Sequence, residues 1–305
     1  MKNRIVRYLQ SHTAEVQGIF WMLAASFWFA SMASIVKHLT ATTEPFVVVF
    51  FRSLFALVCT LPGIYKYGFK KIKTNHWNFY VTRAITGTIG MVLIFVAISK
   101  LPITSVTALT FTVPLITSVF AVIYLNEKLK SHNIIALIFG FLGILIILRP
   151  GTDTFQTASL LVLGAACCWS VSNILIKKLT KTDDPQVIVY LMIIIMIPFS
   201  FIIALFKWET PGLEELIWLF VLGFVSNQAQ FALAHAYSRA DMATVLPFDF
   251  SRMIFITIMA YIFFNEIVDI YTITGSIVIF YSGFYIMKKQ KKKKPPIIDS
   301  SETLN

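Results

Sequence analysis

The chain has 305 residues, of which 57% are hydrophobic and only 13% are charged, and its formal net charge is +11. A soluble domain carries roughly twice that charged fraction and could not cover so apolar a surface with polar groups, so the composition excludes a soluble globular protein. The basic residues sit mainly in short loops and at the C-terminus, which is typical of a membrane topology signal and argues against nucleic-acid binding.

Ten apolar segments follow one another along the chain, each near the ~20 residues that a helix needs to cross a bilayer. The first follows a basic stretch at residues 1–16 and is too long for a signal peptide. The cuts at 99–102 and 238–241 are short, but one helix over 78–125 would be about 70 Å long. We predict membrane-spanning helices at residues 17–36, 45–65, 78–98, 103–125, 134–149, 158–176, 187–206, 216–237, 242–264 and 271–287.

The basic residues also predict the orientation of these spans. With the N-terminus in the cytoplasm, 19 of the 26 Lys and Arg residues fall in cytoplasmic loops and tails and four fall outside. This asymmetry follows the positive-inside rule. We therefore predict a multi-pass protein of the cell inner membrane with both termini cytoplasmic, ending in a basic tail at residues 289–305 that lies near anionic lipid headgroups.

The two halves of the sequence resemble each other. Residues 23–40, LAASFWFASMASIVKHLT, align with residues 163–180, LGAACCWSVSNILIKKLT, at an offset of 140. Residues 101–129 align with 240–268 at an offset of 139, and an Asn-Glu pair follows the same span in each half, at 126–127 and 265–266. Because a five-helix unit crosses the membrane an odd number of times, its second copy is inverted. The predicted fold is an all-α integral membrane protein of two inverted five-helix repeats, residues 17–150 and 151–288, an architecture common in secondary transporters.

The stretch FFRSLFAL in the second span, and the ends LNEKL and FNEIV of the fourth and ninth spans, resemble the EamA-like branch of the drug/metabolite transporter superfamily. The resemblance covers residues 17–288. It implies two inverted five-helix bundles that move metabolites such as amino acids, sugars or nucleotides. It also implies, as an alternative substrate, S-adenosylmethionine or a nucleotide-like metabolite.

Charged residues inside a span cost about 2.5–3.5 kcal/mol on insertion scales and need a reason. Asp249 and Arg252 lie near the middle of the ninth span, and their i,i+3 spacing places them on one helix face where they can pair. Arg52 lies near the middle of the second span. These three residues suit a solute with a carboxylate or a zwitterion, or else they form an ion-pair cluster that only ties helices together. Arg83, at the start of the third span, is expected to reach the inner membrane surface.

Uncharged residues extend this candidate site. The amides of Asn227 and Gln230 share one face of the eighth span and either orient a polar solute or hold helices together. Trp28, Trp169 and Asn173, in the first and sixth spans, either contact a solute or pack. Two prolines inside the paired fourth and ninth spans, Pro114 and Pro247, are either solute-site hinges or plain kinks.

The sequence gives little support for an enzyme. The five His residues are scattered without metal-ligand spacing, and there is no P-loop or G-x-S-x-G motif, so we expect no catalytic residues, metal or cofactor. The favoured function is a secondary transporter of a small organic solute, monomeric or homodimeric, coupled to protons through Asp249 or to exchange with a second solute. The alternative of another class is a membrane enzyme or scaffold that acts on lipid.

Overall fold

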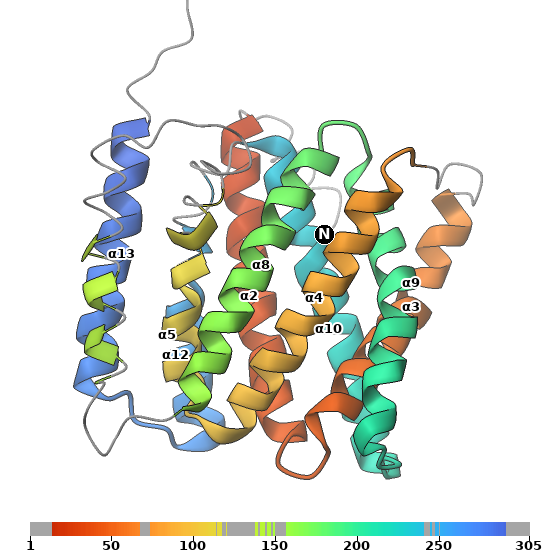
Figure 1. Cartoon of the computed structure of the whole chain (residues 1–305), viewed down its shortest axis with the longest axis horizontal. Coiled ribbons are helices and arrows are strands. Elements are labelled where there is room, and N and C mark those ends of the chain that lie inside the picture. Colours follow the sequence, from red (N-terminus) through yellow and green to blue (C-terminus); the bar gives the residue numbers. More distant parts are fainter. Residues whose placement is uncertain are drawn as a thin grey trace, which may run out of the picture.

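The protein is a bundle of helices that stand side by side (Figure 1). The computed structural model describes residues 14–67, 74–113, 115–117, 120, 138, 139, 141–143, 145–147, 149, 157–240, 245, 248, 249 and 251–290. Within these ranges the elements are α2 (Ala14–Leu39), α3 (Pro45–Tyr67), α4 (Trp77–Lys100), α5 (Ile103–Thr110), α8 (Ala158–Leu179), α9 (Pro185–Ala204), the short 3-10 turn η2 (Leu205–Lys207), α10 (Leu213–Arg239), α12 (Ser251–Phe264) and α13 (Ile270–Gln290).

Six of these helices, α2, α3, α4, α8, α9 with η2, and α10, are long and apolar enough to cross a membrane. Their bounds match the first three and the sixth to eighth predicted spans to within a few residues. The predicted cut at 99–102 is confirmed, since α4 ends at Lys100 and α5 begins at Ile103. Parts of the fourth and fifth predicted spans, and residues 241–244, lie outside the described residues.

Many large apolar side chains are exposed on the outside of the bundle, among them Phe20, Ile89, Phe224 and Ile254, each at 44% or more of its full accessible area. A monomeric soluble protein rarely exposes so much contiguous apolar surface. Lipid is the solvent that makes such a surface stable. Together with the six long apolar helices, this surface identifies a multi-pass membrane protein.

The helix contacts come in matching pairs. α2 packs along α10, and α8 packs along α4. α10 also packs on α3, and α4 also packs on α9. α2 and α8, the helices whose sequences align, run in opposite directions in Figure 1. The buried core therefore lies where helices from the two halves of the chain meet.

Two similar turns connect the first helices of each half. Thr43 N donates to the carbonyl of Leu39 at 2.8 Å, and Asp183 N donates to the carbonyl of Leu179 at 2.8 Å. A proline then opens the next helix, α3 at Pro45 and α9 at Pro185. Proline suits the first helical position because its missing N–H would have no partner there.

Candidate functional site

The predicted pair in the ninth span is present. Arg252 Nη2 of α12 donates to Asp249 Oδ1 at 2.5 Å, and the two side chains are 15% and 18% exposed. Ser26 of α2 is fully buried and donates its hydroxyl to the same carboxylate oxygen at 3.2 Å. The Arg252 guanidinium also lies over the ring of Phe29, 4.7 Å from its centroid. The pair is thus held against α2, where the first half of the chain meets the second.

Arg52 does not join this pair. It is buried on α3, with 4% of its surface exposed, and its Nη1 contacts Met91 Sδ of α4 at 3.0 Å. Its Nε is buried and has no hydrogen-bond partner among the described residues. The structure therefore divides the predicted charged residues into a neutralised pair at the start of α12 and a separate guanidinium between α3 and α4.

The amide face of α10 points into the bundle and contacts the first half of the chain. Asn227 Nδ2 donates to Thr60 Oγ1 of α3 at 2.8 Å, while Asn227 Oδ1 is buried and has no partner in the part of the chain that the structure describes. One turn further on, Gln230 Oε1 accepts a long bond of 3.5 Å from Arg83 Nη2 of α4. Both amides therefore meet hydroxyl or guanidinium groups across the boundary between the halves.

Arg83 is where the sequence interpretation was wrong. It does not reach the membrane surface: only 2% of it is exposed, and its Nε and Nη1 have no hydrogen-bond partner within the described ranges. Gln230 of α10 contacts its guanidinium, and α8 and α9 pack against α4. The missed signal was its place inside an apolar run, six residues after the first residue of α4, rather than at the flank of the run.

The aromatic candidates lie at helix crossings. Trp28 of α2 meets the ring of Phe224 of α10 edge-on, with centroids 6.3 Å apart. Trp169 of α8 lies so close to Gly90 of α4 that a Cβ there would come within 2.9 Å of the indole. Asn173 is half-buried on α8. Pro114 and Pro247, the predicted hinges, lie outside the described residues.

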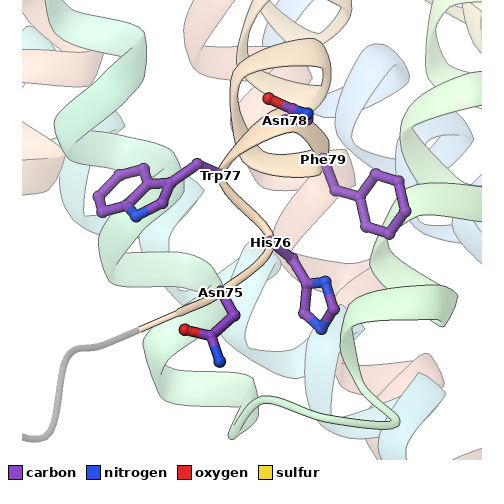
Figure 2. Close-up of a pocket in the computed structure, with 5 residues that line it drawn as sticks. All are labelled: Asn75, His76, Trp77, Asn78 and Phe79. Carbon is purple, nitrogen blue, oxygen red and sulfur yellow. The ribbon is translucent and has the colours of Figure 1, made fainter.

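A surface hollow lies apart from these residues, at the start of α4 (Figure 2). The His76 ring stacks on Phe79, with centroids 5.7 Å apart, and the ammonium of Lys178 lies 5.6 Å from the centroid of the same Phe79 ring. The hollow is lined by one short stretch of chain at the start of α4. It therefore does not lie between the two halves of the chain. Its lining residues are Asn75, His76, Trp77, Asn78 and Phe79.

Comparison with known proteins gives the class. A model of the EamA-like transporter family matches twice, at residues 16–149 and 156–287. The chain therefore belongs to the EamA-like transporter family, as the resemblance seen in its sequence implied. Asp249 and Arg252 fall in the second match and Ser26 in the first, so the charged pair lies between the two matched segments.

The chain is similar to named riboflavin transporters and to named S-adenosylmethionine uptake transporters. The chain is 32% identical over 248 residues to a riboflavin transporter of Vibrio cholerae, which covers 78% of this chain and 82% of that protein. It is 29% identical over 262 residues to an S-adenosylmethionine uptake transporter of Rickettsia bellii, covering 86% of this chain and 90% of that protein. A riboflavin transporter of Brucella anthropi is 30% identical over 260 residues, covering 82% of this chain and 90% of that protein.

The fold also matches a solved crystal structure, with a TM-score of 0.68 over 91% of this chain and 99% of the other. The two sequences are 13% identical, so this comparison concerns the fold alone. It shows that the helix arrangement described above is one that an experimentally determined protein adopts.

Proposed function

We propose that this chain is a secondary active transporter that carries a small polar or zwitterionic organic solute across the inner membrane by alternating access. The single observation that carries the proposal is the Asp249–Arg252 pair, held by Ser26 at the boundary between two EamA segments. Ionic groups between helices at such a boundary are costly unless they serve a solute pathway. The solute would bind between the segments and be exposed to each side in turn.

The proposed architecture has ten helices in two inverted five-helix repeats, residues 17–150 and 151–288. Three observations support it: the two family matches, the paired packing of α2 on α10 and α8 on α4, and the similar turns after α2 and α8. The distribution of basic residues supports cytoplasmic termini. An enzyme or scaffold acting on lipid is less favoured, because Asp249, Gln230 and Asn227 make their contacts between helices, with Ser26, Arg83 and Thr60 respectively.

The names of the relatives supply the first solutes to test. Two classes stand out, riboflavin and S-adenosylmethionine. S-adenosylmethionine carries an amino-acid carboxylate and cationic groups, so its charges are opposite to those of Arg52 and Asp249 respectively. That complementarity makes an amino-acid-like solute the better match to the charged residues, and riboflavin the second candidate.

The test is uptake by purified protein in proteoliposomes, measured separately with labelled S-adenosylmethionine and riboflavin. We expect one of them to accumulate, and Asp249→Asn to lower its initial rate about tenfold or more, which corresponds to roughly 1.4 kcal/mol of lost stabilisation. The matched control is Asp269→Asn. Asp269 also pairs with an arginine, Arg149 at 2.6 Å, but is 42% exposed, so its loss should leave the rate nearly unchanged. An Asp249→Asn protein that transports at the wild-type rate would show that the carboxylate has no part in transport.

A further inference from the structure

Two buried arginines lack a counter-ion in the described part of the chain. Arg52 and Arg83 are the charged side chains there that are fully buried, at 4% and 2% exposure, and no buried Asp or Glu accompanies them. Their hydrogen-bond partners are neutral, the sulfur of Met91 and the amide oxygen of Gln230. Arg252, by contrast, is neutralised by Asp249.

An uncompensated guanidinium is costly to bury, because desolvation is repaid only by a paired charge and well-made hydrogen bonds. Arg83 has the larger deficit of the two. Its Nε and Nη1 are buried and unpaired, and its Nη2 makes only the 3.5 Å contact to Gln230. A guanidinium can bind an anionic group through either of two pairs of nitrogens, Nε with Nη2 or Nη1 with Nη2. In Arg83 each of these pairs contains one N–H donor that has no partner among the described residues.

We propose that Arg83 and Gln230 form the subsite that binds a carboxylate or phosphate group of the transported solute. Either group accepts two parallel N–H bonds from an arginine fork, a geometry specific to planar guanidinium. The inference rests on the proposed transport function and adds to it the charge of the solute and the residue that recognises it.

Asn227 places a second polar group beside this subsite. It precedes Gln230 by one helical turn on α10, and its Oδ1 is a buried acceptor without a partner. A hydroxyl or amino group of the solute would satisfy it while the anionic group satisfies Arg83. Arg83 belongs to the first EamA segment, and Asn227 and Gln230 belong to the second, so such a solute would bridge the two segments that move during transport.

Tyr80, the tyrosine next to Arg83 on α4, does not occupy the open donors of Arg83. Tyr80 lies one turn before Arg83 on α4, and its hydroxyl donates to Asp183 Oδ2 at 2.7 Å. That carboxylate lies at the turn after α8 and makes no ion pair with Arg83 within the described residues. The open donors of Arg83 are therefore left for a group that the chain itself does not supply there.

A thermal-shift experiment separates a binding role from a structural one. The probes are two matched pairs: S-adenosylmethionine with its decarboxylated analogue, and riboflavin monophosphate with riboflavin. In each pair, the anionic member is the one that carries the carboxylate or phosphate group. In the wild-type protein we expect the anionic member of at least one pair to raise the unfolding temperature more than its partner, since a bound ligand stabilises the folded state. Arg83→Gln should abolish that difference, and Arg83→Lys should retain part of it because the charge remains.

The ligand-free proteins give an independent readout. Removing a buried charge that has no partner relieves its desolvation cost, so Arg83→Gln should unfold at or above the wild-type temperature. The control is Arg239→Gln, since Arg239 is exposed and donates to Gln17 Oε1 at 3.0 Å on the outside of the bundle, and this variant should keep the full preference for the anionic probe. A ligand-free Arg83→Gln protein that unfolds more than about 3 °C lower would mean that Arg83 is structural.

Uptake by proteoliposomes distinguishes a failure of the Arg83 subsite from a failure of the proposed transport function. Wild-type protein that transports a probe, with Arg83→Gln transporting it equally well and with the same preference for the anionic member, overturns the subsite alone. Wild-type protein that neither binds nor transports any of the four compounds contradicts the proposed function, and the subsite fails with it. Loss of uptake of the anionic member in Arg83→Gln, with the unfolding temperature maintained, supports both.

Discussion

Lys37 and Lys177 make equivalent contacts at the ends of two helices that run in opposite directions. Lys37 Nζ of α2 donates to the carbonyls of Ile98 and Leu101 at 3.1 and 2.9 Å, at the end of α4. Lys177 Nζ of α8 donates to the carbonyls of Tyr237 and Ala240, both at 3.2 Å, at the end of α10. Each lysine thus satisfies carbonyls that a helix C-terminus leaves unpaired, and its charge is favourable there.

Removing either lysine should destabilise the protein. We expect Lys37→Met and Lys177→Met each to lower the free energy of unfolding by about 1–3 kcal/mol, because the carbonyls lose charge-assisted bonds. Thermal unfolding in detergent measures this. The control is Lys207→Met, since Lys207 is 60% exposed and 3.6 Å from Glu44, and exposed pairs contribute little. An equal effect for all three variants would show that the helix ends do not depend on these lysines.

A close helix crossing makes Gly223 of α10 intolerant of a side chain. An added Cβ would lie 2.8 Å from the backbone nitrogen of Ala56 and 2.6 Å from Phe55 Cβ, both on α3. Because backbone atoms cannot yield easily, Gly223→Ala should cost about 1–3 kcal/mol as an overpacking change.

Gly87 of α4 is the matched comparison. A Cβ there meets only the flexible end of Met196, at 3.9 Å. Gly87→Ala should therefore leave stability unchanged or raise it by about 0.5–1 kcal/mol, since alanine favours a helix. Unfolding midpoints of the two variants, measured side by side, check the prediction, which is wrong if Gly223→Ala is as stable as Gly87→Ala.

The residue after α12 has left-handed backbone. Asn265 has φ of 51°, a conformation that asparagine and glycine adopt more readily than β-branched residues. It positions Glu266, whose Oε2 accepts the N–H of Ile103 at 3.0 Å at the start of α5, and whose Oε1 lies 3.9 Å from Lys37 Nζ.

We expect Asn265→Val to lower the free energy of unfolding by about 1–2 kcal/mol, and Asn265→Gly to be nearly neutral. Glu266→Ala should also destabilise the protein, because it leaves the start of α5 without its acceptor. Thermal unfolding of the three variants measures these changes in stability. If valine is tolerated as well as glycine, the turn does not require the left-handed conformation.

Apolar run length predicted much of the fold. The six long helices were predictable because lipid demands an unbroken apolar stretch with every backbone bond made internally. The Asp249–Arg252 pair was predictable for a similar reason, since the positions of its residues on one helix follow from local geometry.

Contacts between distant helices were not predictable in the same way. Whether Arg83 reaches the surface or is covered depends on helices much later in the chain, α9, which packs on α4, and α10, whose Gln230 contacts Arg83. The separation of Arg52 from Asp249 likewise depends on which helices α3 contacts. Trp169 was predicted to line the site or pack, but its close approach to Gly90 follows only from the crossing of α8 and α4.

One set of variants tests whether the Asp249–Arg252 pair contributes to stability alone or also to transport. Because both side chains are largely buried, Asp249→Asn leaves a guanidinium without its partner, and Arg252→Gln leaves a carboxylate without its partner. Each single variant should lower the free energy of unfolding by roughly 3 kcal/mol.

The double variant Asp249→Asn with Arg252→Gln removes both charges, so most of that stability should return. Its uptake should not return, because neither the carboxylate nor the guanidinium is then present to bind the solute. Unfolding temperature and proteoliposome uptake are measured on the same preparations, with the probe that the wild-type protein transports. Recovery of uptake together with stability would mean that the pair only holds α12 against α2. Recovery of stability alone, with uptake still about tenfold or more below wild type, places the two charges in the transport pathway.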